Sequence, residues 1–474
     1  MMYAARSECE ALSWRVSFEA NGILLATRSD TGASTIHQAR ISSYRIEDRA
    51  RSVLPDALVD LLDLALAVYV SDRICKRPSR KDSGGAEWGR AFSVRVPVSR
   101  PELWSQPSVM EALADTLWFY TGDRWGFEFT SRPRDHEHYC QVEVFQNNIS
   151  PTRAALFSGG LDSVAGLCIE ALENPAERFL LVGGITGPRL QMLQSKVAAE
   201  VCRQFRSRVD FSLLDFGLYH RADRADRQDE PSQRARGFVF AVLGAVSAIM
   251  SGLGRLAIYE NGIGAINLSH TRAQVGVHLT RAANPLALRR MESLIELVTG
   301  RSFQFELPFL FATKGQMCAR IPREAFGPLL GRTVSCDCFP QRIAGYPQCG
   351  LCTSCLLRRL SLHAAGFTDF DTRNYRVDVL ASHWEAPAAK LFPFRAMLFQ
   401  AGRLQKALAA PDAWQALVLE FPELFEIEHL LLESRPEVAR PHERLVSLYA
   451  QYCSEWEGFP ARPPLSVQNS REGA

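Results

Sequence analysis

Short apolar runs alternate with longer amphipathic segments between residues 153 and 308, and this pattern dominates the middle of the chain. Five runs have the length of buried strands, namely AALF, RFLLVGG, VDFSLLDF, RLAIYE and FQFEL. The segments between them repeat apolar residues at helical spacing. Apolar strands separated by helices are typical of a parallel sheet covered by helices on both faces. The pattern therefore predicts a doubly wound α/β domain.

The flanking regions have different patterns. The N-terminal region combines helices and strands with a hairpin pattern, WRVSFEANGILLAT, whose turn falls at Asn21 and Gly22. Near the C-terminus, segments such as WQALVLEFPELF are helical, polar on one face and separated by prolines. We therefore expect four parts: an N-terminal α+β domain (1–150), the α/β domain (151–330), a cysteine-rich module (331–370) and a helical C-terminal region (371–474).

Composition narrows the class of protein. The 54 basic and 52 acidic residues nearly balance, so no overall field favours nucleic acid or an acidic membrane. No apolar run reaches the ~18 residues that a membrane-spanning helix requires, and the first residues lack a signal-peptide pattern. The longest apolar stretch, GFVFAVLGAVSAIMSGLG, is predicted to be a buried helix. We expect a soluble cytoplasmic protein in which the 12 cysteines are reduced thiols or metal ligands.

The sequence FSGGLDSVAG, residues 157–166, joins the first of these strands to a helix. Glycines let the backbone approach a ligand closely, and the first helical turn presents N–H groups to an anion. The alternative is a tight turn capped by Asp162 or Ser163. Ligands of α/β sheets bind beyond the carboxyl ends of the strands, where this loop lies, which favours phosphate binding. The predicted phosphate-binding residues are Ser158, Gly159, Gly160, Leu161, Asp162 and Ser163, with Asp162 also near Mg²⁺.

A cysteine cluster follows the α/β region. Cys349, Cys352 and Cys355 form two overlapping CxxC steps, and Cys336 and Cys338 lie a short distance upstream. Four thiolates form a closed tetrahedral zinc site, which is a structural rather than a catalytic arrangement. We predict Zn²⁺ held by Cys336, Cys349, Cys352 and Cys355, with Cys338 as the alternative to Cys336. Redox or sulfur-transfer chemistry by a CxxC pair is the competing interpretation.

The combination of SGGLDS with a later CGLCTSCLLRR resembles the PP-loop ATP pyrophosphatase superfamily and, within it, the QueC group of 7-cyano-7-deazaguanine synthases. SQRARGFVFAVLGA resembles the QueC segment in which an arginine precedes an apolar helix, and LPFLFATKGQM resembles its lysine-bearing strand exit. TVSC with the later CGxCxxC resembles its zinc site. The resemblance covers roughly residues 153–366 and implies a five-stranded PP-loop domain that uses ATP, Mg²⁺ and Zn²⁺. The residues to which it gives catalytic roles are Asp162, Lys314, Arg234 and Arg236.

The sequence also departs from QueC. The stretches GGITGPRLQMLQ and ENGIGAINLSHTRAQVGVHLTRAANP do not match its substrate-binding signatures, and the two terminal regions are additional. These features resemble the QueC-like proteins of anti-phage systems, the QatC proteins and their counterparts in type IV CBASS operons. The reaction implied there is ATP-dependent adenylation of 7-carboxy-7-deazaguanine and its transfer to the N-terminal amine of a partner protein, with release of AMP and pyrophosphate. That partner would be a nucleotidyltransferase or Qat protein of the same operon, docked on the terminal regions.

The same resemblance directs attention to four polar residues for deazaguanine recognition. Glu260 and Asn261 follow the fourth strand, and Arg281 and Asn284 belong to the loop TRAANP. Both places correspond to the region where the superfamily binds its second substrate.

Three other functions stay open. A 7-cyano-7-deazaguanine synthase that uses ammonia for queuosine biosynthesis shares the catalytic motifs, but the altered loops and added regions disfavour it. A tRNA sulfuration enzyme would need a catalytic thiol pair and a basic surface, which the near-neutral charge disfavours. A non-catalytic scaffold would not need the intact Ser158, Asp162 and Lys314. We expect no membrane attachment and no direct nucleic-acid binding.

Overall fold

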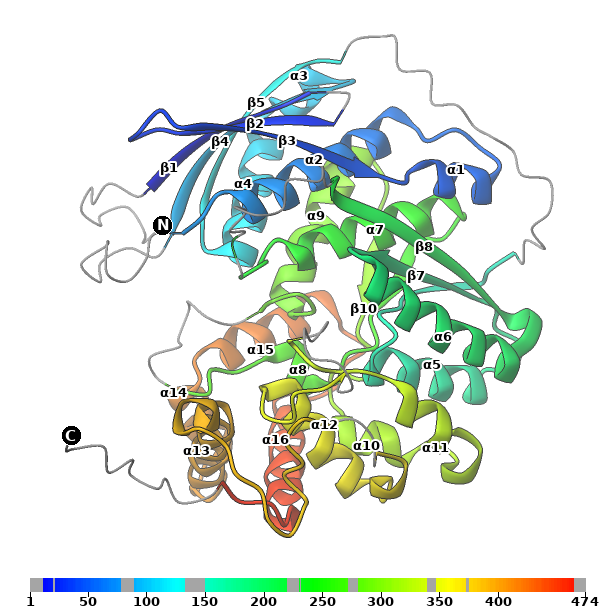
Figure 1. Cartoon of the computed structure of the whole chain (residues 1–474), viewed down its shortest axis with the longest axis vertical. Coiled ribbons are helices and arrows are strands. Elements are labelled where there is room, and N and C mark those ends of the chain that lie inside the picture. Colours follow the sequence, from blue (N-terminus) through cyan, green and yellow to red (C-terminus); the bar gives the residue numbers. More distant parts are fainter. Residues whose placement is uncertain are drawn as a thin grey trace, which may run out of the picture.

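A single mixed sheet runs through most of the molecule, as the computed structural model in Figure 1 shows. The structure describes residues 12–463, except 20–21, 78–88, 133–149, 220–229, 231, 272–279, 339–346 and 372–374. Ten strands hydrogen-bond in the order β10-β9-β6-β7-β8-β3-β2-β1-β4-β5, and six of the nine described pairings are parallel. The fold is therefore a mixed α/β architecture with a mostly parallel sheet.

The five strands of the central region pair in parallel with one another and coincide with the five predicted runs. They are β6 (Arg153–Leu156), β7 (Phe179–Ile185), β8 (Val209–Tyr219), β9 (Arg255–Ala257) and β10 (Gln304–Glu306). The helices between them are α5 (Leu161–Glu173), α6 (Pro188–Phe205), α7 (Arg236–Met250), the short α8 (Gly262–Ile266) and α9 (Pro285–Thr299), with a 3₁₀ turn at Arg206–Arg208. The buried helix predicted from the longest apolar stretch is α7.

Helices cover both faces of this central sheet, as predicted. Side chains alternate along β7, so that Leu180 and Val182 join one core with α7 and α9, while Phe179 and Leu181 join a second core with α5 and α6. Every residue of β7 is buried, which explains why the strand reads as a continuous apolar run rather than an alternating one.

The N-terminal region extends the same sheet. β1 (Leu12–Phe18) and β2 (Ile23–Arg28) form the predicted antiparallel pair, with Gly22 at φ +81° between them; Asn21 lies outside the described residues. β3 (Ser34–Ile41) pairs with β8, and β4 (Arg90–Val98) and β5 (Arg124–Ser131) complete the far edge. The remaining elements here are α1 (Tyr44–Ala50), α2 (Asp56–Ile74), α3 (Pro101–Trp104) and α4 (Pro107–Thr121).

The α+β region expected at 1–150 therefore does not possess a sheet of its own. Pairing of β3 with β8 covers an edge that would otherwise present unpaired N–H and C=O groups. The core formed by α2 and α4 is likewise continuous with the core formed by α7 and α9.

The C-terminal region is helical, as predicted, and lies on the opposite side of the molecule from β1–β5 in Figure 1. Its helices are α13 (Phe392–Leu408), α14 (Ala413–Glu420), α15 (Glu423–Ser434) and α16 (Pro441–Gly458), with a 3₁₀ turn at Ala388–Leu391. Between the last central strand and this region come α10 (Lys314–Ala319), α11 (Arg323–Arg332) and α12 (Thr353–Ala364), with a 3₁₀ turn at Thr368–Asp371. Leu404, Leu417 and Leu448 belong to a separate core that also reaches α8 and α12. Within the described residues, none of the helices is both long and apolar enough to cross a membrane.

Candidate functional site

The glycine loop lies between β6 and the N-terminus of α5. Gly159 has φ +75°, a conformation that favours glycine, and a Cβ there would lie 3.5 Å from the Cγ of Gln194. Gly160 occupies the N-cap of α5, where no side chain caps the helix. The cap by Asp162 or Ser163 that the alternative interpretation required is therefore not formed. Instead, the Ser163 hydroxyl donates to the Gly160 carbonyl at 3.0 Å.

The two loop serines reinforce this conformation. The Ser158 hydroxyl accepts a hydrogen bond from the Gly160 N–H at 3.1 Å and lies 3.2 Å from the Ser163 hydroxyl. The Gln194 side chain, on α6, braces the loop by donating to the Ser158 carbonyl at 3.4 Å. The N–H groups in the first turn of α5 are consequently held in position at the N-terminus of this helix, an arrangement that suits an anion.

A charge centre formed by Asp162, Lys314 and Glu260 lies beside this loop. The Lys314 ammonium is 2.7 Å from the Asp162 carboxylate. Asn261, which is fully buried, donates to Asp162 at 2.9 Å and to Glu260 at 2.8 Å. The chain therefore brings together, in one place, residues from α5, from the end of β9 and from α10.

The charge centre holds two carboxyl groups near one ammonium group, and their pKa values reflect this imbalance. Burial and the neighbouring Asp162 carboxylate raise the pKa of Glu260 to about 8, although Lys314 opposes the shift. Burial works against the charged form of Lys314, but Asp162 and Glu260 outweigh it and raise the pKa of Lys314. At neutral pH we therefore expect a charged lysine beside a largely protonated Glu260. A divalent cation would favour the ionised glutamate, and carboxylate oxygens are the ligands that Mg²⁺ prefers.

The position of Lys314 depends on the C-terminal helix α16. Thr313 caps α10 through a reciprocal capping box with Gln316, and its hydroxyl also donates to the buried Glu455 carboxylate. The carboxylate approaches so closely that a Cβ on Gly315 would lie 2.5 Å from Glu455 Oε1. Sequence reasoning did not identify Glu455, because a glutamate on an amphipathic helix gives no sign of a buried contact with a residue so distant in the chain.

A cavity of about 890 Å³ opens onto the loop and the charge centre. Most of the predicted nucleotide-binding and catalytic residues line it, together with one predicted substrate-binding residue, Glu260. The nucleotide-binding and catalytic residues are Ser158, Gly160, Leu161, Asp162, Ser163, Arg236 and Lys314. Gly159, Arg234, Asn261, Arg281 and Asn284 are not among the lining residues.

The structure separates the two predicted catalytic arginines. Arg236 lines the cavity, its guanidinium lies 5.4 Å from the centre of the Phe240 ring, and its buried Nε has no hydrogen-bond partner among the described residues. Arg234 does not line the cavity, and burial and the nearby positive charge of Arg77 lower its pKa to about 10. Of these two arginines, Arg236 is the one that lines the cavity.

Two of the predicted substrate-binding residues serve local structure instead. The Arg281 guanidinium donates to the Phe119 carbonyl at 2.9 Å and lies 4.3 Å from the centre of that ring. Asn284 caps α9 by accepting from the Leu286 N–H at 3.0 Å, and it donates to the Ile266 carbonyl at 3.3 Å. The structure thus brings Glu260 to the cavity and Asn261 to the charge centre, whereas Arg281 and Asn284 flank the lining residues Ala282 and Ala283 without lining the cavity themselves.

The predicted cysteine cluster is assembled. The sulfur atoms of Cys336, Cys349, Cys352 and Cys355 all lie within 4.8 Å of one another. Two of the separations are 4.0 Å (Cys349 to Cys355) and 3.9 Å (Cys336 to Cys352), close to the roughly 3.8 Å that a tetrahedron of 2.3 Å Zn–S bonds requires. Cys338 is exposed and outside the group, so the structure favours Cys336 as the fourth ligand.

Backbone contacts support these thiols. The N–H groups of Leu351 and Cys352 donate to the Cys349 sulfur at 3.4 and 3.2 Å. Gly350 has φ +86°, and a Cβ there would lie 1.9 Å from the Val377 carbonyl oxygen, so the turn requires glycine. A closed set of four thiols suits a structural zinc ion.

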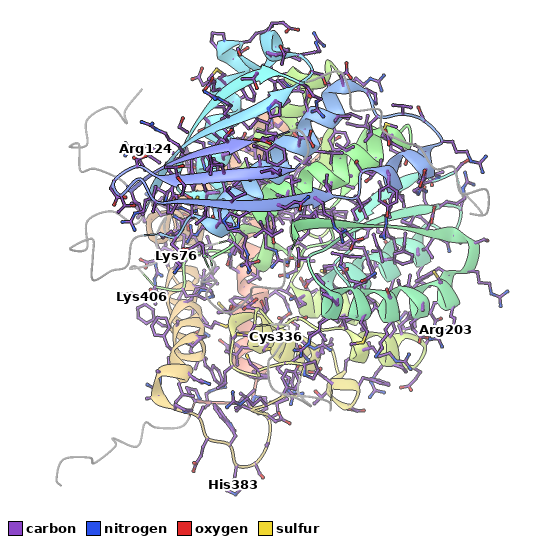
Figure 2. All side chains as sticks on the ribbon, turned by 45° about the horizontal axis from the view of Figure 1, so that its top comes forward. Lys76, Arg124, Arg203, Cys336, His383 and Lys406 are labelled. Atoms are coloured by element: carbon purple, nitrogen blue, oxygen red, sulfur yellow. The ribbon has the colours of Figure 1, made fainter. Side chains whose placement is uncertain are left out.

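The cysteine-rich module also forms one wall of the cavity, through Ser335, Cys336 and Asp337. In Figure 2, Cys336 lies near the middle of the molecule, whereas Arg203 and His383 lie at its outer edge. The metal would therefore fix a loop that faces the glycine loop.

Comparison with protein-family models and curated sequences identified no relative of this chain. No protein-family model matches the chain, and no curated protein sequence matches it significantly. The residues around the cavity therefore carry the functional proposal.

Proposed function

We propose that this protein is an ATP-dependent ligase that adenylates 7-carboxy-7-deazaguanine and transfers the acyl group to an amine, most favourably the N-terminal amine of a partner protein in an anti-phage system. The observation that carries the proposal is the Asp162–Lys314 ion pair beside the glycine loop, at the wall of a large cavity. The motif resemblance to the QueC group supplies the choice of acid, and the additional terminal regions favour a protein acceptor.

The nucleotide would bind at the glycine loop. Backbone N–H groups at the start of α5 and the hydroxyls of Ser158 and Ser163 suit the β- and γ-phosphates. Lys314 and Arg236 would stabilise the negative charge that develops on the leaving pyrophosphate. Neither cation needs to move far, because both already line the cavity.

Asp162 and Glu260 are the residues that would hold Mg²⁺. When bound, the ion neutralises polyphosphate charge and helps to orient the α-phosphate. Asn261 keeps the two carboxyl groups together through its hydrogen bonds to both.

The proposed reaction has two steps. A carboxylate oxygen of the acid attacks the α-phosphorus, and the bond to the bridging oxygen breaks as pyrophosphate leaves. The amine then attacks the acyl carbon, AMP leaves with one former carboxylate oxygen, and the nitrogen loses a proton to give an amide. Proximity and orientation within the cavity are the main contributions of the protein to both steps.

Intact-mass and nucleotide analysis tests this proposal. The purified protein would be incubated with ATP, Mg²⁺ and 7-carboxy-7-deazaguanine, with either ammonium or the proteins encoded beside its gene. We expect AMP release and a gain in partner mass of one amide-linked deazaguanine, both lost in Asp162→Ala. Asp215→Ala is the matched control, because Asp215 pairs with Arg45 outside the cavity lining. Free nitrile formed from ammonium, with every partner unmodified, would favour the biosynthetic synthase instead.

A further inference from the structure

One wall of the cavity is built in part by the N-terminal region. Tyr69 and Arg73 line the cavity from α2, where their spacing of four residues places them on one face of the helix. Gln233 and Arg236 line it from the segment that enters α7. The N-terminal region was expected only as a docking surface. It nevertheless supplies a cation to the same cavity that the glycine loop and the charge centre line.

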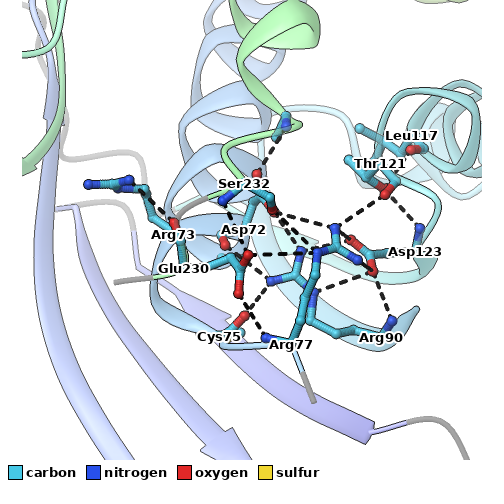
Figure 3. Close-up of polar contacts among 12 residues, drawn as sticks. Asp72, Arg73, Cys75, Arg77, Arg90, Leu117, Thr121, Asp123, Glu230 and Ser232 are labelled. Carbon is cyan, nitrogen blue, oxygen red and sulfur yellow. Dashed lines mark hydrogen bonds and ion pairs between the residues drawn. The ribbon is translucent and has the colours of Figure 1, made fainter. Parts of the chain in front are cut away.

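Hydrogen bonds hold Arg73 beside the chain that leads into α7. The Glu230 N–H donates to the Arg73 carbonyl at 2.8 Å, and the Arg73 guanidinium donates to the Glu230 carbonyl at 3.3 Å. In Figure 3 the Arg73 side chain extends away from Asp123. Gln233 has φ +45°, a conformation that is uncommon for residues other than glycine and is enriched at ligand sites. The Arg236 N–H donates to the Gln233 carbonyl at 3.3 Å and closes this turn.

The charge of Arg236 is poorly compensated. Its Nε has no hydrogen-bond partner among the described residues, and its guanidinium contacts the Phe240 ring rather than a carboxylate. Burial and the positive charge of Arg73 lower the pKa of Arg236, although Tyr69 opposes the shift. Arg73 and Arg236 are both partly exposed residues of the cavity lining, so a ligand in the cavity can reach them. An anion between two such neighbouring cations would offset their repulsion.

Phosphate is the anion that this pair favours, because a guanidinium group presents several N–H donors in a plane that matches phosphate oxygens. We propose that Arg73 and Arg236 together bind the polyphosphate of ATP, the part that leaves as pyrophosphate, so that the N-terminal region forms part of the nucleotide site. This inference rests on the proposed function and deepens it. Arg73 lies outside residues 153–366, which carry the resemblance to QueC, so no motif indicated it.

The extended sheet keeps Arg73 in a fixed position relative to the glycine loop. β3 of the N-terminal region pairs with β8, and α2 shares one hydrophobic core with α7. A polyphosphate bound at the glycine loop would therefore meet a cation whose place is set by the fold. Such preorganised charge is the kind that stabilises a leaving group effectively.

Calorimetric titration of the full-length protein with pyrophosphate, in the presence of Mg²⁺, tests the assignment. Arg73→Met removes the charge and its donors, so we expect about 10-fold weaker binding, the usual effect of losing a hydrogen bond to a charged group. Arg73→Lys keeps the charge and should bind more tightly than Arg73→Met. Arg255→Met is the matched control and should bind like the wild type, because Arg255 pairs with Glu306 in an exposed position outside the cavity lining.

A salt series distinguishes a direct contact from a structural role. Because Arg73 also donates to the Glu230 carbonyl, its loss can disturb the entry into α7. Direct contact with the anion predicts that binding to Arg73→Met depends less steeply on the KCl concentration than binding to the wild type. A structural defect alone would leave that slope unchanged.

The outcomes separate this inference from the proposed function. Equal pyrophosphate affinities of the wild type and Arg73→Met, or equal salt slopes, would overturn the assignment of Arg73 even if AMP is formed. Absence of pyrophosphate binding by the wild type would overturn it as well. Binding that weakens in Arg73→Met, without AMP release by the wild type from ATP, Mg²⁺ and 7-carboxy-7-deazaguanine, would support the anion site and contradict the ligase reaction.

Discussion

Two clusters of buried charge in this molecule differ in how completely their groups are satisfied. One cluster joins Asp72, Arg77, Arg90 and Asp123 in the N-terminal region, as Figure 3 shows. Asp123 accepts from Arg77 and Arg90 at 2.7 Å each, and Asp72 accepts from Arg90 at 2.5 Å. Two carboxylates thus meet two guanidinium groups, and the four charges balance.

The charge centre at the cavity is not balanced in this way. Asp162 and Glu260 share the single Lys314 ammonium, the pKa of Glu260 rises to about 8, and the nearby Arg236 Nε has no partner among the described residues. The comparison teaches that buried charge by itself does not mark a functional site. Charge that is left partly uncompensated, next to space for a ligand, is the more informative signal.

The balanced cluster still acts on the site through the backbone. Asp72 accepts from the Ala235 N–H at 3.0 Å, and Glu230 accepts from the Arg77 N–H at 2.9 Å. Both contacts fix the segment that leads into α7. Arg236, the first residue of that helix, is consequently held at the cavity by a network remote from the proposed chemistry.

The largest expected effect is on stability, at the balanced cluster. Asp123→Ala leaves two buried guanidinium groups undercompensated and should lower the free energy of unfolding by about 3–5 kcal/mol. Urea denaturation followed by circular dichroism measures this loss. Asp115→Ala is the control, because the Asp115–Arg290 pair is half exposed and should change stability by only about 0.5 kcal/mol. Equal losses in the two variants would contradict the role given to the cluster.

Removing the Lys314 ammonium, the cation of the charge centre, should affect the rate of the reaction. Lys314→Met is expected to lower the rate of AMP release by roughly 10²–10³-fold, the usual effect of losing a group that stabilises transition-state charge. Lys196→Met, on the exposed surface of α6, should leave the rate unchanged. The nucleotide assay measures both variants, and full activity of Lys314→Met would refute the proposed role of the charge centre.

The two neighbouring arginines should respond differently. Arg236→Met removes a charged donor at the cavity and should slow AMP release by roughly 10- to 100-fold. Arg234 does not line the cavity, so Arg234→Met should keep the rate near that of the wild type. If Arg234→Met slowed AMP release more than Arg236→Met, the assignment of Arg236 as the catalytic arginine would be wrong.

The last prediction concerns the pH dependence of stability. The Glu260 carboxyl stays protonated in the folded protein up to about pH 8, whereas in the unfolded chain it ionises near pH 4.5. The unfolded state therefore binds fewer protons between these values, and the free energy of unfolding should fall as the pH rises through this window. In Glu260→Gln this contribution is absent, so urea titrations from pH 5 to about 8 should give a flatter pH dependence. Identical slopes for the two proteins would contradict the raised pKa.

Local patterns predicted the parts of the fold and site that depend on neighbours in the sequence. The glycine loop, the five central strands and the Cys349, Cys352 and Cys355 steps could be identified because their spacing is itself the structural requirement. The choice of Cys336 over Cys338 depended on tertiary structure, since both lie equally close along the chain.

Long-range contacts account for what could not be predicted. The pairing of β3 with β8 joins strands about 175 residues apart, which no local pattern specifies. Glu455 follows the periodicity of a core-facing helix, so its carboxylate gave no signal. For Asn284 a signal did exist: an asparagine before Pro285 is typical of a helix N-cap followed by proline at the first helical position, which favours a structural role.

Transfer of labelled oxygen tests the central claim most directly. The wild-type protein would be incubated with ATP, Mg²⁺, an amine acceptor and 7-carboxy-7-deazaguanine whose carboxylate carries heavy oxygen, and the AMP would be analysed by mass spectrometry. Adenylation predicts that one heavy oxygen from the carboxylate appears in the phosphate of AMP, and that Lys314→Met forms this product far more slowly. Unlabelled AMP, or ADP as the nucleotide product, would contradict an acyl-adenylate formed at the Asp162–Lys314 centre.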